Sequence, residues 1–239
     1  MPRIDRYLSS QLRISRRDVR LMLAQRRVEV DGILVSEIAQ RINKFSVVRH
    51  DGVTIQDIKA RYLMLNKPAG TVSATIDDSH RTLIDLLDYP EKEQLHIVGR
   101  LDYNSTGLVL LTNDGSWSKK LTRPENHYIK RYRVRLEKPL RQEHVEAFSQ
   151  GMYFAFENIT TRPAHLRILS RFEAEVALTE GRYHQIRRMF GRFQNKVLSL
   201  HRIAIGSLTL DPTLSPGSYR ELSIDEVTES LSPLETPCS

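Results

Sequence analysis

The sequence predicts an α+β protein, because it contains two kinds of hydrophobic periodicity in separate segments. Apolar residues recur at helical spacing near the N-terminus and again over residues 186–193. Strict alternation of apolar and polar residues, typical of half-buried strands, occurs over 130–136 and 173–178, and again from 198 to 210. These patterns indicate both kinds of element, and they leave the order of the strands in a sheet open.

The composition is that of a soluble globular protein with an excess of positive charge. The 239 residues are 40% hydrophobic and 27% charged, with a formal net charge of +7. Much of this excess lies in residues 1–60, where twelve Lys/Arg stand against seven Asp/Glu. A basic segment of this kind favours a polyanionic partner without identifying it.

The motif inventory excludes several classes of chemistry. The single cysteine, Cys238, can form neither an internal disulfide nor a Cys-based metal site. The eight histidines form no metal-binding pattern, and the chain has no P-loop or Gly-x-Gly-x-x-Gly fingerprint. No apolar run approaches the length of a membrane span, and the N-terminus lacks a signal-peptide pattern. We therefore expect a cytoplasmic protein that uses ordinary side chains, without a metal, a cofactor or a membrane.

The N-terminal segment is expected to form a small domain over residues 1–58. Ser15 is a suitable N-cap for a helix from Arg16 to Gln25, one face of which is apolar. Residues 28–35 predict a β-hairpin around an Asp-Gly turn. A charge run on a helix is commonly a solvated face, but arginine also binds phosphate in bidentate fashion and stacks on bases. The arginines gathered around this helix are Arg16, Arg17, Arg20, Arg26 and Arg27.

A second domain is expected over residues 61–227, followed by a Ser/Pro/Thr-rich tail, 228–239, that we expect to be disordered. Pro and Gly separate its predicted elements. Apart from the alternating strands and the helix already named, these elements are a strand at 61–66, a turn at 67–70, a helical patch at 83–87, an apolar strand after Gly107 and a short helix at 116–121.

One acidic residue stands out by its surroundings. Asp102 ends a Gly-Arg-Leu-Asp segment, residues 99–102, shortly before a Thr-Gly turn and an apolar strand. We expect a short loop at the edge of a sheet to carry this carboxylate, with Gly107 permitting close backbone approach. A lone aspartate is most often a solvated surface residue. This segment nevertheless resembles the catalytic-aspartate motif of the RsuA-type family of RNA pseudouridine synthases.

Two further segments resemble motifs of the same family, in the expected order. Lys-Arg-Tyr, ending at Tyr132, is similar to its Lys-x-Tyr element, whose tyrosine stacks on the target base; by pattern alone this residue belongs to the core. Residues 181–190 are similar to its third motif, in which the basic residue two places after the glutamine pairs with the catalytic aspartate. The resemblance therefore implies Asp102, Tyr132 and Arg187 as the catalytic residues.

The resemblance also implies contacts with RNA. Arg100 is expected to help hold the position that a flipped base vacates, and Lys130 and Arg188 are expected to contact the RNA. His184 receives no catalytic role, and we expect a structural role or an RNA contact for it. Residues 15–32 resemble the small RNA-binding module first seen in a ribosomal protein, here called S4-like, so its arginines are expected to bind RNA shape and backbone.

The implied reaction requires no cofactor. Pseudouridine formation breaks the N1–C1′ bond of uridine, turns the uracil and rejoins it to the ribose through C5, so neither electrons nor phosphate groups are transferred. The target base must leave the RNA stack, at a cost of a few kcal/mol. Asp102 then acts at the ribose, either as the nucleophile at C1′ or as the base that removes the C2′ proton. The guanidinium of Arg187 is expected to stabilise the ionised carboxylate.

The fold that the resemblance implies is a small helical S4-like RNA-binding domain followed by a synthase domain with a mixed, mostly antiparallel sheet. Small-subunit (16S) ribosomal RNA is the expected substrate, because residues 181–185 and 200–206 look more like that branch. Large-subunit (23S) rRNA is the alternative, and a non-catalytic ribosome-assembly factor is the rival from another class. The expected partner is rRNA or a precursor of the small subunit, bound by a monomer.

Overall fold

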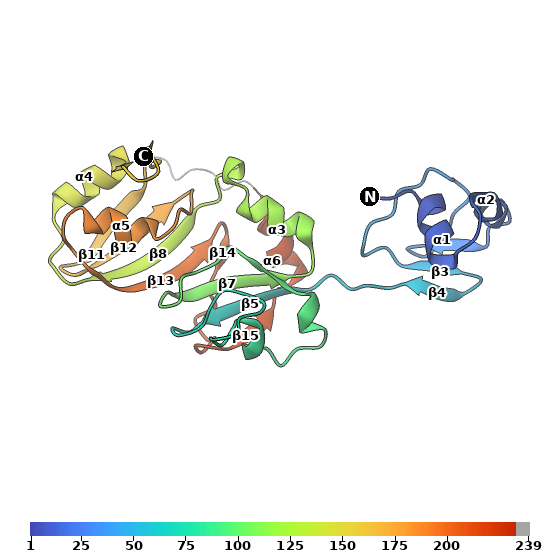
Figure 1. The fold of residues 1–239 in the computed structure, drawn as a ribbon, viewed down its shortest axis with the longest axis horizontal. Coiled ribbons are helices and arrows are strands. Elements are labelled where there is room, and N and C mark those ends of the chain that lie inside the picture. The colour runs from blue at the N-terminus through green and yellow to red at the C-terminus, as the bar shows by residue number, and fades with distance from the viewer. Residues whose placement is uncertain (233–239) are drawn as a thin grey trace. The chain divides into compact units, whose positions relative to one another are not determined.

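The computed structural model describes residues 1–232, and the expected tail therefore lies partly outside the described residues. The chain divides into two compact units, Met1–Ala60 and the part from Arg61 onward (Figure 1). Each unit contains a hydrophobic core of its own. Within the described residues, no helix has both the length and the apolar character needed to cross a bilayer.

The N-terminal unit consists of two helices packed on a four-stranded antiparallel sheet. The expected helix and first hairpin are present, but a second hairpin around Asp51 and Gly52 makes the unit less helical than predicted. Its strands are too short to produce a visible period in the sequence. The elements are α1 (Ile4–Leu12), α2 (Arg16–Ala24), β1 (Val28–Val30), β2 (Ile33–Leu34), β3 (Val48–His50) and β4 (Val53–Gln56), with the sheet order β2-β1-β3-β4.

The helix α2 follows the predicted pattern. Ser15 caps it, because its hydroxyl accepts a hydrogen bond from the Asp18 N–H at 3.2 Å. Val19, Met22 and Leu23 are buried in the core of the unit. The arginines of α2 are all exposed, which leaves a cationic helix face in contact with solvent.

The larger unit is built on a nine-stranded mixed sheet (Figure 1). Its order is β11-β12-β8-β13-β7-β5-β15, with β14 beside β13 and β6 beside β7. Only β13 and β7 run parallel among the pairs of this sheet in the described chain, which confirms the expected mixed, mostly antiparallel sheet. The strands are β5 (Tyr62–Lys67), β6 (His96–Val98), β7 (Thr106–Thr112), β8 (Lys130–Leu136), β11 (His165–Ser170), β12 (Glu173–Leu178), β13 (Val197–Ile205), β14 (Leu208–Thr209) and β15 (Tyr219–Glu221).

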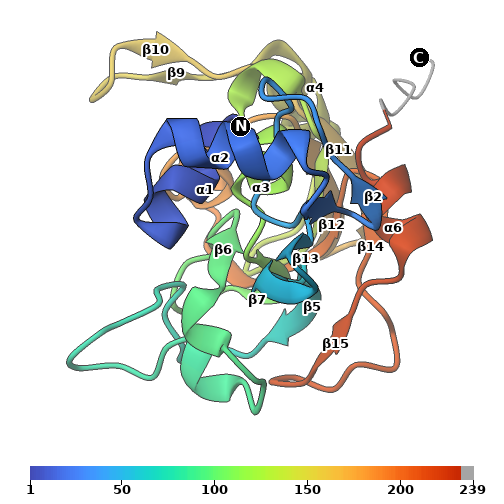
Figure 2. The same ribbon diagram turned by 90° about the vertical axis from the view of Figure 1, so that its right-hand side faces the viewer.

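Helices lie on both faces of this sheet, and a small hairpin projects from the unit (Figure 2). Trp117 and Val227, from α3 and α6, pack on one face, whereas Phe148 and Phe190, from α4 and α5, pack on the other. The helices are α3 (Gly115–Thr122), α4 (Gln142–Gln150), α5 (Gln185–Gly191) and α6 (Ile224–Glu229), with 3₁₀ turns at Ile84–Leu86, Lys92–Gln94 and Pro124–Asn126; the hairpin is β9 (Tyr153–Phe154) with β10 (Ile159–Thr160).

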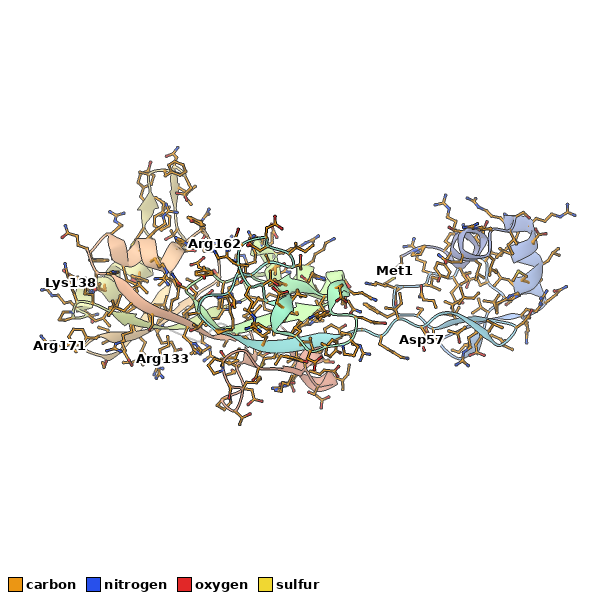
Figure 3. The ribbon with its side chains drawn as sticks, turned by 60° about the horizontal axis from the view of Figure 1, so that its bottom comes forward. Met1, Asp57, Arg133, Lys138, Arg162 and Arg171 are labelled. Atoms are coloured by element: carbon orange, nitrogen blue, oxygen red, sulfur yellow. The ribbon has the colours of Figure 1, made fainter. Side chains whose placement is uncertain are left out.

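The strand β8 shows the predicted alternation. Tyr132, Val134 and Leu136 are buried, while Arg133 and Arg135 are exposed. In Figure 3, Arg133 lies on the side of the sheet away from α5. The buried residues of β8 therefore share a core with α4 and α5, and the opposite face of this strand is in contact with solvent.

The alternating segment from 198 to 210 forms two strands, because Gly206, with φ of 59°, turns the chain between β13 and β14. The expected disordered tail is wrong for its first residues: α6 extends through Glu229, and the buried Ser230 hydroxyl accepts a hydrogen bond from the Trp117 indole at 2.9 Å. Composition alone did not reveal this contact with a residue 113 positions earlier.

Candidate active site

Asp102 lies in the short loop between β6 and β7. Its carbonyl accepts a hydrogen bond from the Ser105 N–H at 3.0 Å, which closes the turn. The preceding Leu101 is buried, and the Ser73 hydroxyl contacts both its carbonyl and its N–H, at 2.7 and 3.0 Å. The Asp102 side chain keeps 33% of its surface exposed. A firmly held backbone therefore presents this carboxylate to a cleft rather than to the core.

A buried lysine braces this loop. Lys67 ends β5 with no exposed surface, and its ammonium donates to the carbonyl oxygens of Pro68, Tyr103 and Ser105 at 2.8–3.0 Å. Burial lowers the pKa of Lys67 to about 8, and the negative charge of Asp102 opposes this shift. The three donors of the ammonium are therefore matched by three carbonyl acceptors, two of which belong to the loop that carries the carboxylate.

Arg202 supports the same loop from β13. It is almost completely buried, and its guanidinium donates to the carbonyls of Leu108, at 2.7 Å, and Gly99, at 2.6 Å. Gly107, with φ of 101°, lies against the Arg202 backbone, where an added Cβ would meet the carbonyl oxygen at 2.3 Å. Glycine is thus required where β7 pairs with β13, and the sequence predicted a close backbone approach at Gly107.

Two side chains at the start of α5 reach the carboxylate. His184 Nε2 lies 3.5 Å from Asp102 Oδ1, and Arg187 Nε lies 4.0 Å from Oδ2. Arg187 also donates to the Val197 carbonyl at 3.1 Å, which orients its guanidinium. His184 adopts the left-handed conformation, with φ of 49°, and its ring stacks on Tyr183 with 4.0 Å between centroids. The structure therefore brings Arg187 to Asp102 as expected, and adds a histidine contact that was not expected.

Tyr132 forms part of the wall of the same cleft. It is only 7% exposed, yet it lines a cleft of about 920 Å³ together with Asp102 and Lys130. Lys130 lies two residues earlier on the same face of β8. Burial lowers the pKa of Lys130 to about 8, aided by repulsion from Arg202 and opposed by Glu180. Tyr132 is therefore at once a core residue and a surface of the cleft.

The rim of the cleft is rich in arginine. Arg100, Arg162 and Arg182 line it and are exposed, and they come from three separate loops. Glu180 is buried beneath them and accepts hydrogen bonds from the Arg182 guanidinium, at 3.0 Å, and the Gln185 amide, at 2.7 Å. The placement of Arg100 beside Asp102 follows from the sequence, whereas the convergence of the other two depends on the fold.

Arg188, which was expected to contact RNA, is engaged within the protein. It forms a bidentate pair with Glu157, and its guanidinium lies 3.8 Å from the centroid of the Phe154 ring. The pairing with Arg188 lowers the pKa of the Glu157 carboxyl. Arg188 therefore ties the β9–β10 hairpin to α5.

The N-terminal arginines lie on the surface of their own unit. Arg27 is paired with Asp51, with 2.9 Å between Nε and Oδ1, and this pairing lowers the pKa of the Asp51 carboxyl. Four arginine side chains form no hydrogen bond or ion pair with any residue that the structure describes, and these are Arg16, Arg17, Arg20 and Arg26.

Sequence reasoning missed the two buried cations, although the sequence contains a signal for each. Arg202 stands at an inward-facing position of an alternating strand, between Leu200 and Ala204. Lys67 ends an apolar strand just before a proline. A charged side chain at an inward-facing strand position must find hydrogen-bond partners. Which carbonyls supply them could not be read from the sequence.

Comparison with known proteins shows which family the chain resembles. A family model described as RNA pseudouridylate synthase matches residues 61–191. The chain is 47% identical to ribosomal small subunit pseudouridine synthase A of Pseudomonas aeruginosa and 41% identical to that of Escherichia coli K12, covering 94% of this chain and 98% of each relative.

A solved structure is also similar. It is described as a pseudouridylate synthase, with 35% identity and a TM-score of 0.70 over 96% of this chain and 100% of the other. The match extends over both units, and the family model covers Asp102, Tyr132 and Arg187. The chain therefore belongs to the RNA pseudouridylate synthase family.

Proposed function

We propose that this enzyme isomerises one specific uridine of small-subunit ribosomal RNA to pseudouridine in the cytoplasm, with Asp102 as its catalytic carboxylate. The observation that carries this proposal is the placement of Asp102: a partly exposed carboxylate in a cleft, with Arg187 and His184 beside it. The names of the similar proteins support the small subunit as the source of the substrate. The partner is then rRNA or a precursor of the small subunit, bound by a monomer.

The chemistry requires a carboxylate at the ribose. Asp102 either attacks C1′ or removes the C2′ proton, and in both cases the N1–C1′ bond breaks and uracil is released within the cleft. Once the C1′–C5 bond has formed, C5 gives up its proton and N1 gains one, so the reaction is balanced without a further reactant. Arg187 and the buried Lys67 supply positive charge that stabilises the ionised carboxylate.

The cleft must also hold a base outside the RNA stack. Tyr132 offers a flat ring for the uracil, and its position in the core makes that ring rigid. Lys130 lies beside it, and Arg100 stands at the rim, where it can occupy the space that the base leaves. These contacts offset the few kcal/mol that base flipping costs.

The N-terminal unit fits the role of an S4-like RNA-binding domain. Its helix α2 presents unpaired arginines to solvent, and such a face binds phosphate without reading base sequence. Arg27 contributes less than the others to this surface, because Asp51 already neutralises it. The unit therefore positions the RNA, while the cleft selects the uridine.

The test is tritium release from small-subunit rRNA labelled at uracil C5. The wild type is expected to release label, and Asp102→Asn is expected to release none. Asp225→Asn, on the exposed start of α6, serves as the matched control and should retain wild-type activity. Release from 23S rRNA alone would move the substrate to the large subunit. Failure on both RNAs would favour a non-catalytic assembly factor, and release by Asp102→Asn would remove Asp102 as the catalytic residue.

A further inference from the structure

The tip of the β9–β10 hairpin carries an aromatic residue in water. Phe156 is 97% exposed, more than any other large hydrophobic residue in the described chain. Single exposed apolar residues are common and carry no meaning by themselves. Phe156 differs from the other exposed apolar residues in its position, because its neighbour Glu157 lines the cleft that contains Asp102. The exposed aromatic residue therefore directly precedes, in the chain, a residue that lines the active-site cleft.

Contacts with α5 and with Arg192 hold the short hairpin in place. Its two strands pair over only two residues each, and a hairpin of this size is unstable alone. Arg188 holds it from α5 through Glu157 and through the ring of Phe154, and Arg192 donates to the Tyr153 carbonyl at 3.1 Å. Arg188, in α5, and Arg192, at the C-terminal end of α5, thus hold the hairpin whose tip is exposed.

The basic rim of the cleft indicates which kind of partner the hairpin contacts. Arg100, Arg162 and Arg182 line the same cleft as Glu157, so a polyanion bound there reaches a residue of the hairpin. When one nucleotide is flipped into the cleft, its neighbours lose a stacking partner. An exposed aromatic ring is the side chain that replaces such a partner, because every base has a face to stack on.

We propose that Phe156 stacks on an unpaired base that flanks the target uridine, so that the hairpin is a second contact site for the RNA. This inference rests on the proposed RNA substrate, and it assigns the Arg188–Glu157 pair the role of positioning the hairpin. Arg188 then acts on RNA binding through Phe156 and not by direct contact. The sequence predicted a direct RNA contact for Arg188, whereas in the structure its guanidinium pairs with Glu157 of the hairpin.

A fluorescence experiment tests the stacking directly. The chain has a single tryptophan, Trp117, which is 2% exposed and reports only the core. In a Phe156→Trp variant, a small-subunit rRNA transcript is expected to quench the new emission in a saturable way, because the indole stacks on a base. Ile224→Trp is the matched control, since Ile224 is 73% exposed on α6 and outside the residues that line the cleft. Equal emission of both variants with and without RNA would overturn the proposal.

Affinity supplies the second measurement. Phe156→Ala is expected to weaken binding of the same transcript by about 5- to 150-fold, the range for loss of one base–aromatic stack. Phe156→Tyr should restore most of the affinity, because it keeps the ring. The dependence of binding on salt should not change, since no phosphate contact is lost. Wild-type affinity in Phe156→Ala would overturn the proposal.

These measurements separate the inference from the proposed reaction. Quenching and affinity are measured without turnover, in the Asp102→Asn background, so they do not depend on the catalytic role of Asp102. Quenching of Phe156→Trp together with absent tritium release from the wild type would support the RNA contact and reject the reaction. Tritium release by the wild type, without quenching of Phe156→Trp, would support the reaction and reject the RNA contact.

Discussion

Replacing Lys67 by methionine tests whether a buried ammonium holds the Asp102 loop in place. The substitution removes three hydrogen bonds to carbonyl oxygens, each worth about 1.5–3 kcal/mol when the donor is charged. It also removes the cost of burying the charge, which is several kcal/mol. We expect a net loss of about 3 kcal/mol in the free energy of unfolding, or about 6–12 °C in Tm for a unit of this size.

The loss should depend on pH in a defined direction. The pKa of Lys67 is lowered to about 8 in the folded state, against about 10.4 in an unfolded chain. Between these values the unfolded state binds the extra proton, so raising the pH stabilises the wild type relative to its unfolded chain. The methionine variant lacks this group. The difference between the two proteins should therefore widen by about 2 kcal/mol from pH 7 to pH 9.5.

The assay is denaturant unfolding, monitored by the fluorescence of Trp117, which lies in a core of the larger unit. Lys119→Met, on the exposed side of α3, is the control and should unfold with the wild type. Tritium release should fall at least tenfold in Lys67→Met even where the protein is folded, because the loop that carries Asp102 is loosened. A variant within 1 kcal/mol of the wild type, with full activity, would refute the bracing role.

Two further predictions concern the packing of β7 and the charge of the cleft. Gly107→Ala should unfold the larger unit or destabilise it by more than about 3 kcal/mol, because the added Cβ meets the Arg202 carbonyl at 2.3 Å. Gly115→Ala, with open space around the added Cβ, is the control. The Tm of both variants tests this prediction. The affinity of the wild type for rRNA should fall as the pH rises through 8, because Lys130, whose burial-lowered pKa is about 8, loses its charge. Lys130→Gln should lose this step, and a step of equal size in both proteins in an RNA-binding titration would contradict the assignment.

Much of the site could be predicted because its motifs are local. The Gly-Arg-Leu-Asp segment, the alternation that buries Tyr132 and the helical stripe next to Arg187 are each contained in about ten residues. Periodicity determines which side of a strand or helix is buried, so these side chains could be placed on their elements. That Arg187 reaches Asp102 was implied by resemblance to a family, since 85 positions of chain separate the two residues and no local pattern spans them.

The residues that were missed or misassigned depend on distant contacts. The partners of Lys67 and Arg202 are carbonyl oxygens, which every residue has, so no side-chain pattern points to them. Arg188 looked like a free cation because Glu157 lies 31 positions away on a separate hairpin. Ser230 looked like part of a flexible tail because its partner, the Trp117 indole, is equally remote in sequence.

The sequence by itself determined the α+β class, the basic N-terminal segment, the element that carries each catalytic candidate and, through its motifs, the family. Tertiary structure alone decided which cations are buried, which of them support the Asp102 loop, and that the hairpin tipped by Phe156 contributes Glu157 to the cleft. The physical reason is that local periodicity encodes the direction of a side chain, whereas its partner depends on which segments the sheet order brings together.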